Sequence, residues 1–243
     1  MTISLSKKML LEQEGFSLNS DLLREMFAHA KPFGHHEDAK TLNLGFGFLY
    51  YGLVRALRPQ HVVVIGSGYG FSVVCLALGL KDNGKGRLSF IDPSYSLLKN
   101  GPFKTIGGVG FWDDPEKVRE HFRRFEVEDV VTHYKLRSDE FFPVYYEKAL
   151  PPIDVAFIDG SHALKDVRYD FLRVLAHSRK NTYIFLHDTN IYIREMLQHA
   201  GVKKWLQAVR SQPELFEVLD FPFASGVALV RVRQANAWKH VAS

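Results

Sequence analysis

Two aspartates at the ends of apolar runs are the residues best suited to hold a cation. Asp159 ends the run IDVAFID (153–159), and Asp188 ends the run TYIFLHD (182–188). If these runs are neighbouring parallel strands about 4.8 Å apart, both carboxylates can reach one cation. Carboxylates with waters suit Mg²⁺, whereas a ligand such as His187 would favour Mn²⁺ or another transition metal. The alternative is that both aspartates only cap the helices that follow them.

A histidine close to these aspartates could move a proton. His162 follows Asp159 by three residues, and a neutral imidazole can accept a proton near neutral pH. The position suits a general base, and it equally suits an ordinary surface residue in the first turn of a helix. His35 and His36 could bind a metal or a substrate, although a loop pair without a third partner favours an ordinary loop. Asn190 is a further candidate oxygen ligand.

A glycine-rich turn follows the apolar run HVVVIG (61–66). The turn reads GSGYG (66–70), and its glycines permit a tight turn with a ligand close to the backbone. A dinucleotide fingerprint would require Gly or Ala where the chain has Phe71, so a pyrophosphate site is disfavoured. Asp92 ends the next run and could accept hydrogen bonds from two ribose hydroxyls. It could instead simply start an Asp-Pro turn.

Apolar runs and helical stretches alternate along most of the chain. This alternation predicts a Rossmann-like α/β fold, with a mostly parallel sheet and helices on both faces. The connection 222–225 is too short for a crossover, so the last two of seven strands should form an antiparallel hairpin. The expected strands lie at 61–66, 87–92, 130–136, 153–159, 182–188, 216–221 and 226–232, and the expected helices between them at 71–82, 114–126, 138–149, 163–178 and 194–211.

The segment 1–58 reads as an N-terminal helical cap that precedes a second unit at 59–243. Ser20 is expected to cap a first helix, and the apolar stretch 41–57 to form a packed or broken second one. The connection 93–113 exceeds about 15 residues, a length typical of functional lids. Its aromatic and glycine residues favour a mobile cover over a binding site.

Four strand-end motifs together resemble those of a known family. VVVIGSGYGFSVVCLAL, FIDPS, VAFIDGSH and FLHDT, read in chain order, are similar to the motifs of class I S-adenosylmethionine-dependent methyltransferases. The resemblance covers about residues 60–232 and is strongest to the metal-dependent O-methyltransferases of the catechol and sugar or natural-product types. Those types place an Asn ligand after, or a Glu ligand before, the second aspartate. This chain has Thr189 and His187 at those positions and departs from both patterns.

The resemblance implies a cofactor, a reaction and a set of site residues. The cofactor would be S-adenosylmethionine, and the reaction the methylation of a hydroxyl on a small molecule, assisted by Mg²⁺ or Mn²⁺. The catalytic base would be His162, and the metal ligands Asp159, Asp188 and His187. The implied cofactor contacts are Gly66, Ser67, Gly68, Asp92, Ser138 and Asp139.

Composition limits the other function classes. The 243 residues carry a net charge of +4 without any long basic run, so no nucleic-acid partner is expected. No apolar run reaches the roughly 18 residues of a membrane helix, and the single cysteine, Cys75, permits no internal disulfide. We therefore expect a cytoplasmic protein and leave open whether it forms a homo-oligomer.

Three alternatives remain beside the O-methyltransferase. An amino-group methyltransferase acting on nucleic acid is disfavoured, because the segment 159–162 reads DGSH and lacks the Asn/Asp-Pro-Pro-aromatic motif of that class. Phe71 disfavours a nicotinamide-dependent oxidoreductase. The departures at His187 and Thr189 leave open a non-catalytic protein that binds S-adenosylmethionine or a nucleoside on the same fold.

Overall fold

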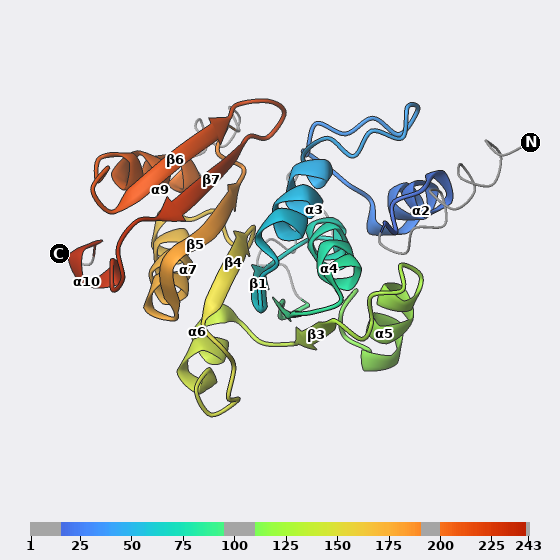
Figure 1. Cartoon of the computed structure of the whole chain (residues 1–243), viewed down its shortest axis with the longest axis horizontal. Coiled ribbons are helices and arrows are strands. Elements are labelled where there is room, and N and C mark those ends of the chain that lie inside the picture. The colour runs from blue at the N-terminus through green and yellow to red at the C-terminus, as the bar shows by residue number, and fades with distance from the viewer. Residues whose placement is uncertain (1–15, 95–109, 191–199, 242–243) are drawn as a thin grey trace, which may run out of the picture.

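A seven-stranded sheet forms the centre of the molecule (Figure 1). The structure is a computed structural model that describes residues 16–94, 110–190 and 200–241. The strand order is β3-β2-β1-β4-β5-β7-β6, with β1 to β5 parallel and β7 antiparallel to both of its neighbours. This confirms the predicted fold class. The strands are β1 His61–Ile65, β2 Arg87–Ile91, β3 Val131–Tyr134, β4 Ile153–Ile158, β5 Ser178–His187, β6 Phe216–Phe221 and β7 Val227–Val232.

Helices cover both faces of the sheet and bury two apolar layers. In β1, Val62 and Val64 face the layer under α3 and α4, whereas Val63 and Ile65 face the layer under α7 and α9. A parallel strand buried on both faces therefore reads as a continuous apolar run. The helices are α2 Ser20–Glu25, the π-helix η1 Met26–Ala30, α3 Phe46–Leu57, α4 Phe71–Asn83, α5 Pro115–Arg123, α6 Ser138–Phe141, the 3₁₀-helix η2 Phe142–Val144, α7 Leu164–Ala176, α9 Gly201–Arg210 and α10 Trp238–Val241.

Strand register brings the predicted site residues to one edge. Ile65 pairs with Ile91 of β2 and with Ile158 of β4, and Ile158 pairs with Leu186 of β5. The chain leaves each of these parallel strands at the same edge of the sheet, where ligands bind in open α/β folds. The glycine turn and the aspartates that follow β2, β4 and β5 therefore lie along this edge.

The N-terminal elements differ from the prediction in their boundaries. Asn19, not Ser20, caps α2, since its side-chain oxygen accepts hydrogen bonds at 3.0 Å from the two backbone N–H groups of Asp21 and Leu22. The second helix begins only at Phe46, after a turn closed by a β-bridge between residues 38 and 43. These elements share an apolar core with α4. The boundary near residue 58 stays a prediction.

Two other predicted segments need correction. The helix expected over 138–149 is α-helical only to Phe141 and continues as the 3₁₀-helix η2 to Val144, because Pro143 cannot supply the N–H that a continuing α-helix needs. The cover expected over 93–113 falls mainly on residues 95–109, which lie outside the described residues. Trp112 was expected in that cover, but it is 1% exposed and belongs to the core.

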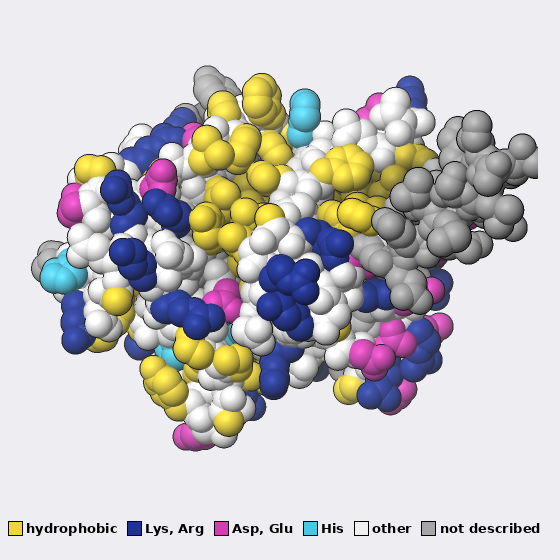
Figure 2. Space-filling view, in the orientation of Figure 1, with side chains coloured by type: hydrophobic (Ala, Val, Ile, Leu, Met, Phe, Trp, Pro, Cys, Tyr) yellow, Lys and Arg dark blue, Asp and Glu magenta, His cyan; other side chains and the backbone are white. Residues whose placement is uncertain are grey.

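The surface agrees with an ordinary charge distribution. In Figure 2, the Lys and Arg side chains form several separate groups on the visible face, with Asp, Glu and apolar residues between them. Within residues 16–94, 110–190 and 200–241, no helix has both the length and the apolar character needed to cross a membrane. Cys75 is buried and free.

Candidate functional site

The glycine turn after β1 packs directly against the end of β4. Gly66 and Gly68 have φ of 69° and 45°, in the region that favours glycine. A Cβ on Gly66 would lie 2.5 Å from the carbonyl oxygen of Asp159, so no larger residue fits there without a shift of the backbone. Ser67 is buried, and its hydroxyl lies 2.6 Å from the hydroxyl of Ser72 on α4. The glycine turn and the backbone of Asp159 are therefore in direct contact.

Asp92 lies at the end of β2 with one oxygen already engaged. Its Oδ1 accepts a hydrogen bond of 2.7 Å from the backbone N–H of Ser94, and the residue is 8% exposed. Burial raises the pKa of Asp92 to about 6, although the Ser94 N–H favours the ionised form. Donors such as a pair of ribose hydroxyls would lower the cost of burying this carboxylate.

The two weaker cofactor candidates have protein partners. The hydroxyl of Ser138 bonds to the carboxylate of Asp170, whose pKa is raised to about 7, mainly by burial. Asp139 forms an ion pair with Arg137 at the surface. Their predicted role beside the adenine stays a prediction.

Asp159, Asp188 and His162 converge at the ends of β4 and β5. Each offers one ligand atom, and these atoms all lie within 4.8 Å of one another. Nε2 of His162 is 3.0 Å from Oδ2 of Asp188 and 3.6 Å from Oδ1 of Asp159. Adjacent ligands of an octahedral ion with bonds of about 2.1 Å lie roughly 3 Å apart. We call Asp159 and Asp188 the carboxylate pair. Together with His162 it fits a divalent cation.

The backbone at Asp188 is arranged for this convergence. Asp188 follows β5 with a φ of 63°, in the left-handed region that side chains other than glycine adopt sparingly. Such conformations cluster at functional sites. The residue is 9% exposed, and the hydroxyl of Ser225, in the β6–β7 turn, bonds to its carboxylate.

His187 does not join the candidate metal ligands but lies between the carboxylates as a counter-ion. Its Nδ1 is 3.1 Å from Oδ1 of Asp159 and 3.3 Å from Oδ1 of Asp188. Although burial opposes the charged form, the two carboxylates raise the pKa of His187 to about 9. The charged form of His187 is therefore favoured, while burial raises the pKa of Asp188 itself to about 7. The expectation of His187 as a metal ligand stays a prediction that this geometry does not favour.

The N-terminal region contributes His35, which the sequence left open as either a ligand or an ordinary loop residue. His35 is 5% exposed, and its ring centroid lies 4.3 Å from that of His187. Its Nδ1 lies 3.1 Å from the hydroxyl of Tyr50, and burial lowers its pKa, so the ring is neutral. The sequence favoured an ordinary loop for the pair His35 and His36 because it showed no further partner nearby. The partner of His35 is His187, which lies far along the chain.

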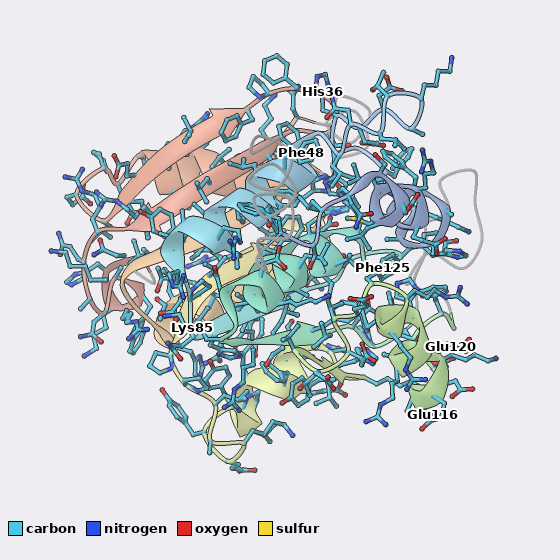
Figure 3. The ribbon with its side chains drawn as sticks, turned by 45° about the vertical axis from the view of Figure 1, so that its right-hand side comes forward. His36, Phe48, Lys85, Glu116, Glu120 and Phe125 are labelled. Atoms are coloured by element: carbon cyan, nitrogen blue, oxygen red, sulfur yellow. The ribbon has the colours of Figure 1, made fainter. Side chains whose placement is uncertain are left out.

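The other residues weighed near the site have different surroundings. His36 is exposed and lies at the rim of the molecule (Figure 3), where its ring centroid is 5.7 Å from that of Phe223. The side-chain amide of Asn190 donates a hydrogen bond of 3.0 Å to the carbonyl of Pro222. In the described residues, neither side chain is part of the group that can hold a metal.

Comparison with known proteins gives one matching family model. The model for a methyltransferase domain matches residues 63–189, more than half of the chain and the part that carries the glycine turn, Asp92 and the carboxylate pair. A curated relative, the uncharacterised protein y4gI of Sinorhizobium fredii, is 23% identical over 200 residues. That alignment covers 81% of this chain and 20% of the longer relative.

Several solved structures share the fold. The O-methyltransferase TomG of Streptomyces achromogenes, solved in complex with S-adenosylmethionine, aligns with a TM-score of 0.63 at 16% identity and covers 95% of this chain and 96% of its own. An O-methyltransferase of Bacillus cereus, solved in complex with S-adenosylhomocysteine, aligns with a TM-score of 0.62 at 18% identity and covers 95% and 97%. At these identities the likeness extends to the fold alone.

Proposed function

The chain belongs to the methyltransferase-domain family, and we propose that it transfers the methyl group of S-adenosylmethionine to a hydroxyl of a small molecule. Both TomG and the Bacillus cereus protein are described as O-methyltransferases and were solved with S-adenosylmethionine or its product. The proposal extends that chemistry to this chain through the residues at its sheet edge.

One observation carries this proposal. The glycine turn is in van der Waals contact with the backbone of Asp159, where a Cβ on Gly66 would lie 2.5 Å from the carbonyl oxygen. A methyl donor held by the turn and by Asp92 would therefore lie beside the carboxylate pair and His162. Proximity and alignment of two reactants supply much of the catalysis in a direct displacement.

The proposed reaction needs an acceptor oxygen that has lost its proton. The oxygen attacks the methyl carbon as the bond from sulfur to carbon breaks, and S-adenosylhomocysteine leaves. We propose that His162 takes the hydroxyl proton, because its imidazole lies 3.0 Å from Asp188, which would stabilise the resulting imidazolium. A divalent cation at the carboxylate pair would supply Lewis-acid activation of the hydroxyl.

A second role for His162 is favoured by the same distance. The 3.0 Å separation from Asp188 also suits a ligand of the cation, which would make His162 the third protein ligand. The variant His162→Ala separates these roles. A base predicts unchanged metal affinity with a methyl-transfer rate lowered about 10²- to 10⁴-fold, whereas a ligand predicts loss of metal binding by calorimetry.

A thermal-shift screen tests the proposed function without knowledge of the acceptor. S-adenosylhomocysteine at about 100 times its dissociation constant should stabilise the chain by roughly 2.7 kcal/mol, equivalent to about 5 to 10 °C. NAD at the same concentration should give no shift. A shift with NAD and none with S-adenosylhomocysteine would support the oxidoreductase alternative instead. The small-molecule hydroxyl acceptor and the cytoplasmic location stay predictions, and the oligomeric state stays open.

A further inference from the structure

We propose that Trp112 and Ser94 form a clamp that holds the two cofactor-binding turns in fixed relation, with Trp112 as a positioning residue for S-adenosylmethionine. A chain of three hydrogen bonds links Asp92 to Gly68. Ser94 N–H donates to Asp92 Oδ1 at 2.7 Å, Trp112 N–H donates to Ser94 Oγ at 2.8 Å, and Trp112 Nε1 donates to the Gly68 carbonyl at 3.1 Å. This inference rests on the proposed function.

Aromatic packing fixes the indole ring in this position. Trp112 stacks on Phe122 of α5 with a centroid distance of 5.6 Å and an interplanar angle of 6°. The ring edges of Phe90 and His121 meet it at centroid distances of 5.0 and 5.2 Å. A ring held from several sides has one orientation, so its N–H points at one carbonyl.

The clamp acts where the turn has little rigidity of its own. Gly68 has a φ of 45° and lacks a side chain that would restrict it. The indole N–H fixes its carbonyl, and a Cβ on Gly70 would lie only 3.0 Å from the indole ring. The other end of the clamp fixes Ser94, which has a φ of 64° and supplies the N–H to Asp92. A preformed cradle lowers the ordering cost of binding.

The indole N–H of Trp112 shows that this residue does more than fill space in the core. Filling the same volume would require only an apolar side chain, whereas the bond to Gly68 requires a donor at the ring edge. Ser94 is likewise 3% exposed, and its hydroxyl connects Trp112 with the turn that follows β2.

Calorimetric titration with S-adenosylhomocysteine tests the clamp. Trp112→Phe keeps an aromatic ring and removes the Nε1–H that donates to the Gly68 carbonyl. Ser94→Ala removes the hydroxyl that accepts from the Trp112 backbone N–H and that also bonds to the side chain of Asp113. Since one hydrogen bond contributes about 0.5 to 1.5 kcal/mol, each variant should bind roughly 2- to 13-fold more weakly. The double variant should bind about as weakly as either single variant, because either change already breaks the same chain.

A matched control removes packing from the same aromatic cluster without a hydrogen bond. Phe125, which follows α5 (Figure 3), is fully buried, and its ring centroid lies 5.3 Å from that of His121. Phe125→Leu should lower the melting temperature and leave the affinity for S-adenosylhomocysteine within twofold. Titrations at 10 °C, with folding checked by circular dichroism, keep every variant in its native state.

The outcomes separate the clamp from the proposed function. If the parent chain binds S-adenosylhomocysteine and folded Trp112→Phe and Ser94→Ala bind it equally well, the clamp is wrong and the proposed function stands. Weaker binding by Phe125→Leu to the same extent as by Trp112→Phe would also overturn the clamp, since general loosening of the core would explain both. A parent chain that binds no S-adenosylhomocysteine would overturn both inferences.

Discussion

Replacing His187 by leucine should destabilise the protein in a way that depends on pH. The carboxylates of Asp159 and Asp188 hold the pKa of His187 at about 9, above the ordinary value of 6.5. A histidine whose pKa is higher in the folded than in the unfolded chain stabilises the folded state. This contribution is fully present below pH 6.5 and is lost as the pH rises through 9. The shift corresponds to on the order of 3 kcal/mol at most, because burial raises the pKa of Asp188 to about 7 and so weakens the charge that holds His187 protonated.

Urea unfolding of the parent chain and His187→Leu, followed by circular dichroism, measures this difference. We expect the free energies of unfolding to differ by up to about 3 kcal/mol at pH 6.5 and by less than about 1 kcal/mol at pH 10. His177 offers a control, because burial lowers its pKa and its Nδ1 bonds to the Arg173 carbonyl rather than to a carboxylate. For His177→Leu, the difference in the free energy of unfolding from the parent chain should not shrink toward pH 10. A difference for His187→Leu that stays constant or widens toward pH 10 would show that the two carboxylates do not stabilise a charged His187.

Mn²⁺ affinity, measured by calorimetry, should rise between pH 6.5 and 9, because a cation at the carboxylate pair displaces the proton of His187; a flat profile would contradict this competition. Gly66→Ala should lower both the free energy of unfolding and the affinity for S-adenosylhomocysteine, because the added Cβ would clash with the backbone at the end of β4. Gly52→Ala has open space around the added Cβ, so its free energy of unfolding in urea should rise by roughly 0.5 to 1 kcal/mol. Asn19→Ala should cost about 0.5 to 2 kcal/mol in the same assay and Ser20→Ala much less; the reverse order would restore Ser20 as the cap.

The sheet was predictable because its signals are local and repeated. Continuous apolar runs indicate strands buried on both faces, and the short 222–225 connection excludes a crossover, so the strand types and the final hairpin followed directly. Boundaries were less predictable where two local rules compete. Asn19 and Ser20 are both good capping residues, and only the backbone decides which side chain accepts the hydrogen bonds.

The site was predictable in its residues but not in its pairings. Asp159, Asp188 and His162 could be named from the strand ends, because parallel strands end at one edge of the sheet. The position of His187 between the carboxylates depends on side-chain direction in β5, and its contact with His35 joins segments far apart in the chain. Trp112 was assigned to a mobile cover because composition does not show which aromatic residues reach the core.

We propose that the glycine turn and Asp92 hold the methyl donor beside the carboxylate pair. Calorimetric titration of S-adenosylhomocysteine into the parent chain and into folded Asp92→Ala measures the contribution of Asp92 to that binding. We predict one-to-one binding by the parent chain and a loss of most of that affinity in the variant, because the carboxylate that accepts the ribose hydroxyl protons is gone. No binding by the parent chain, or undiminished binding by Asp92→Ala, would show that Asp92 does not hold the methyl donor.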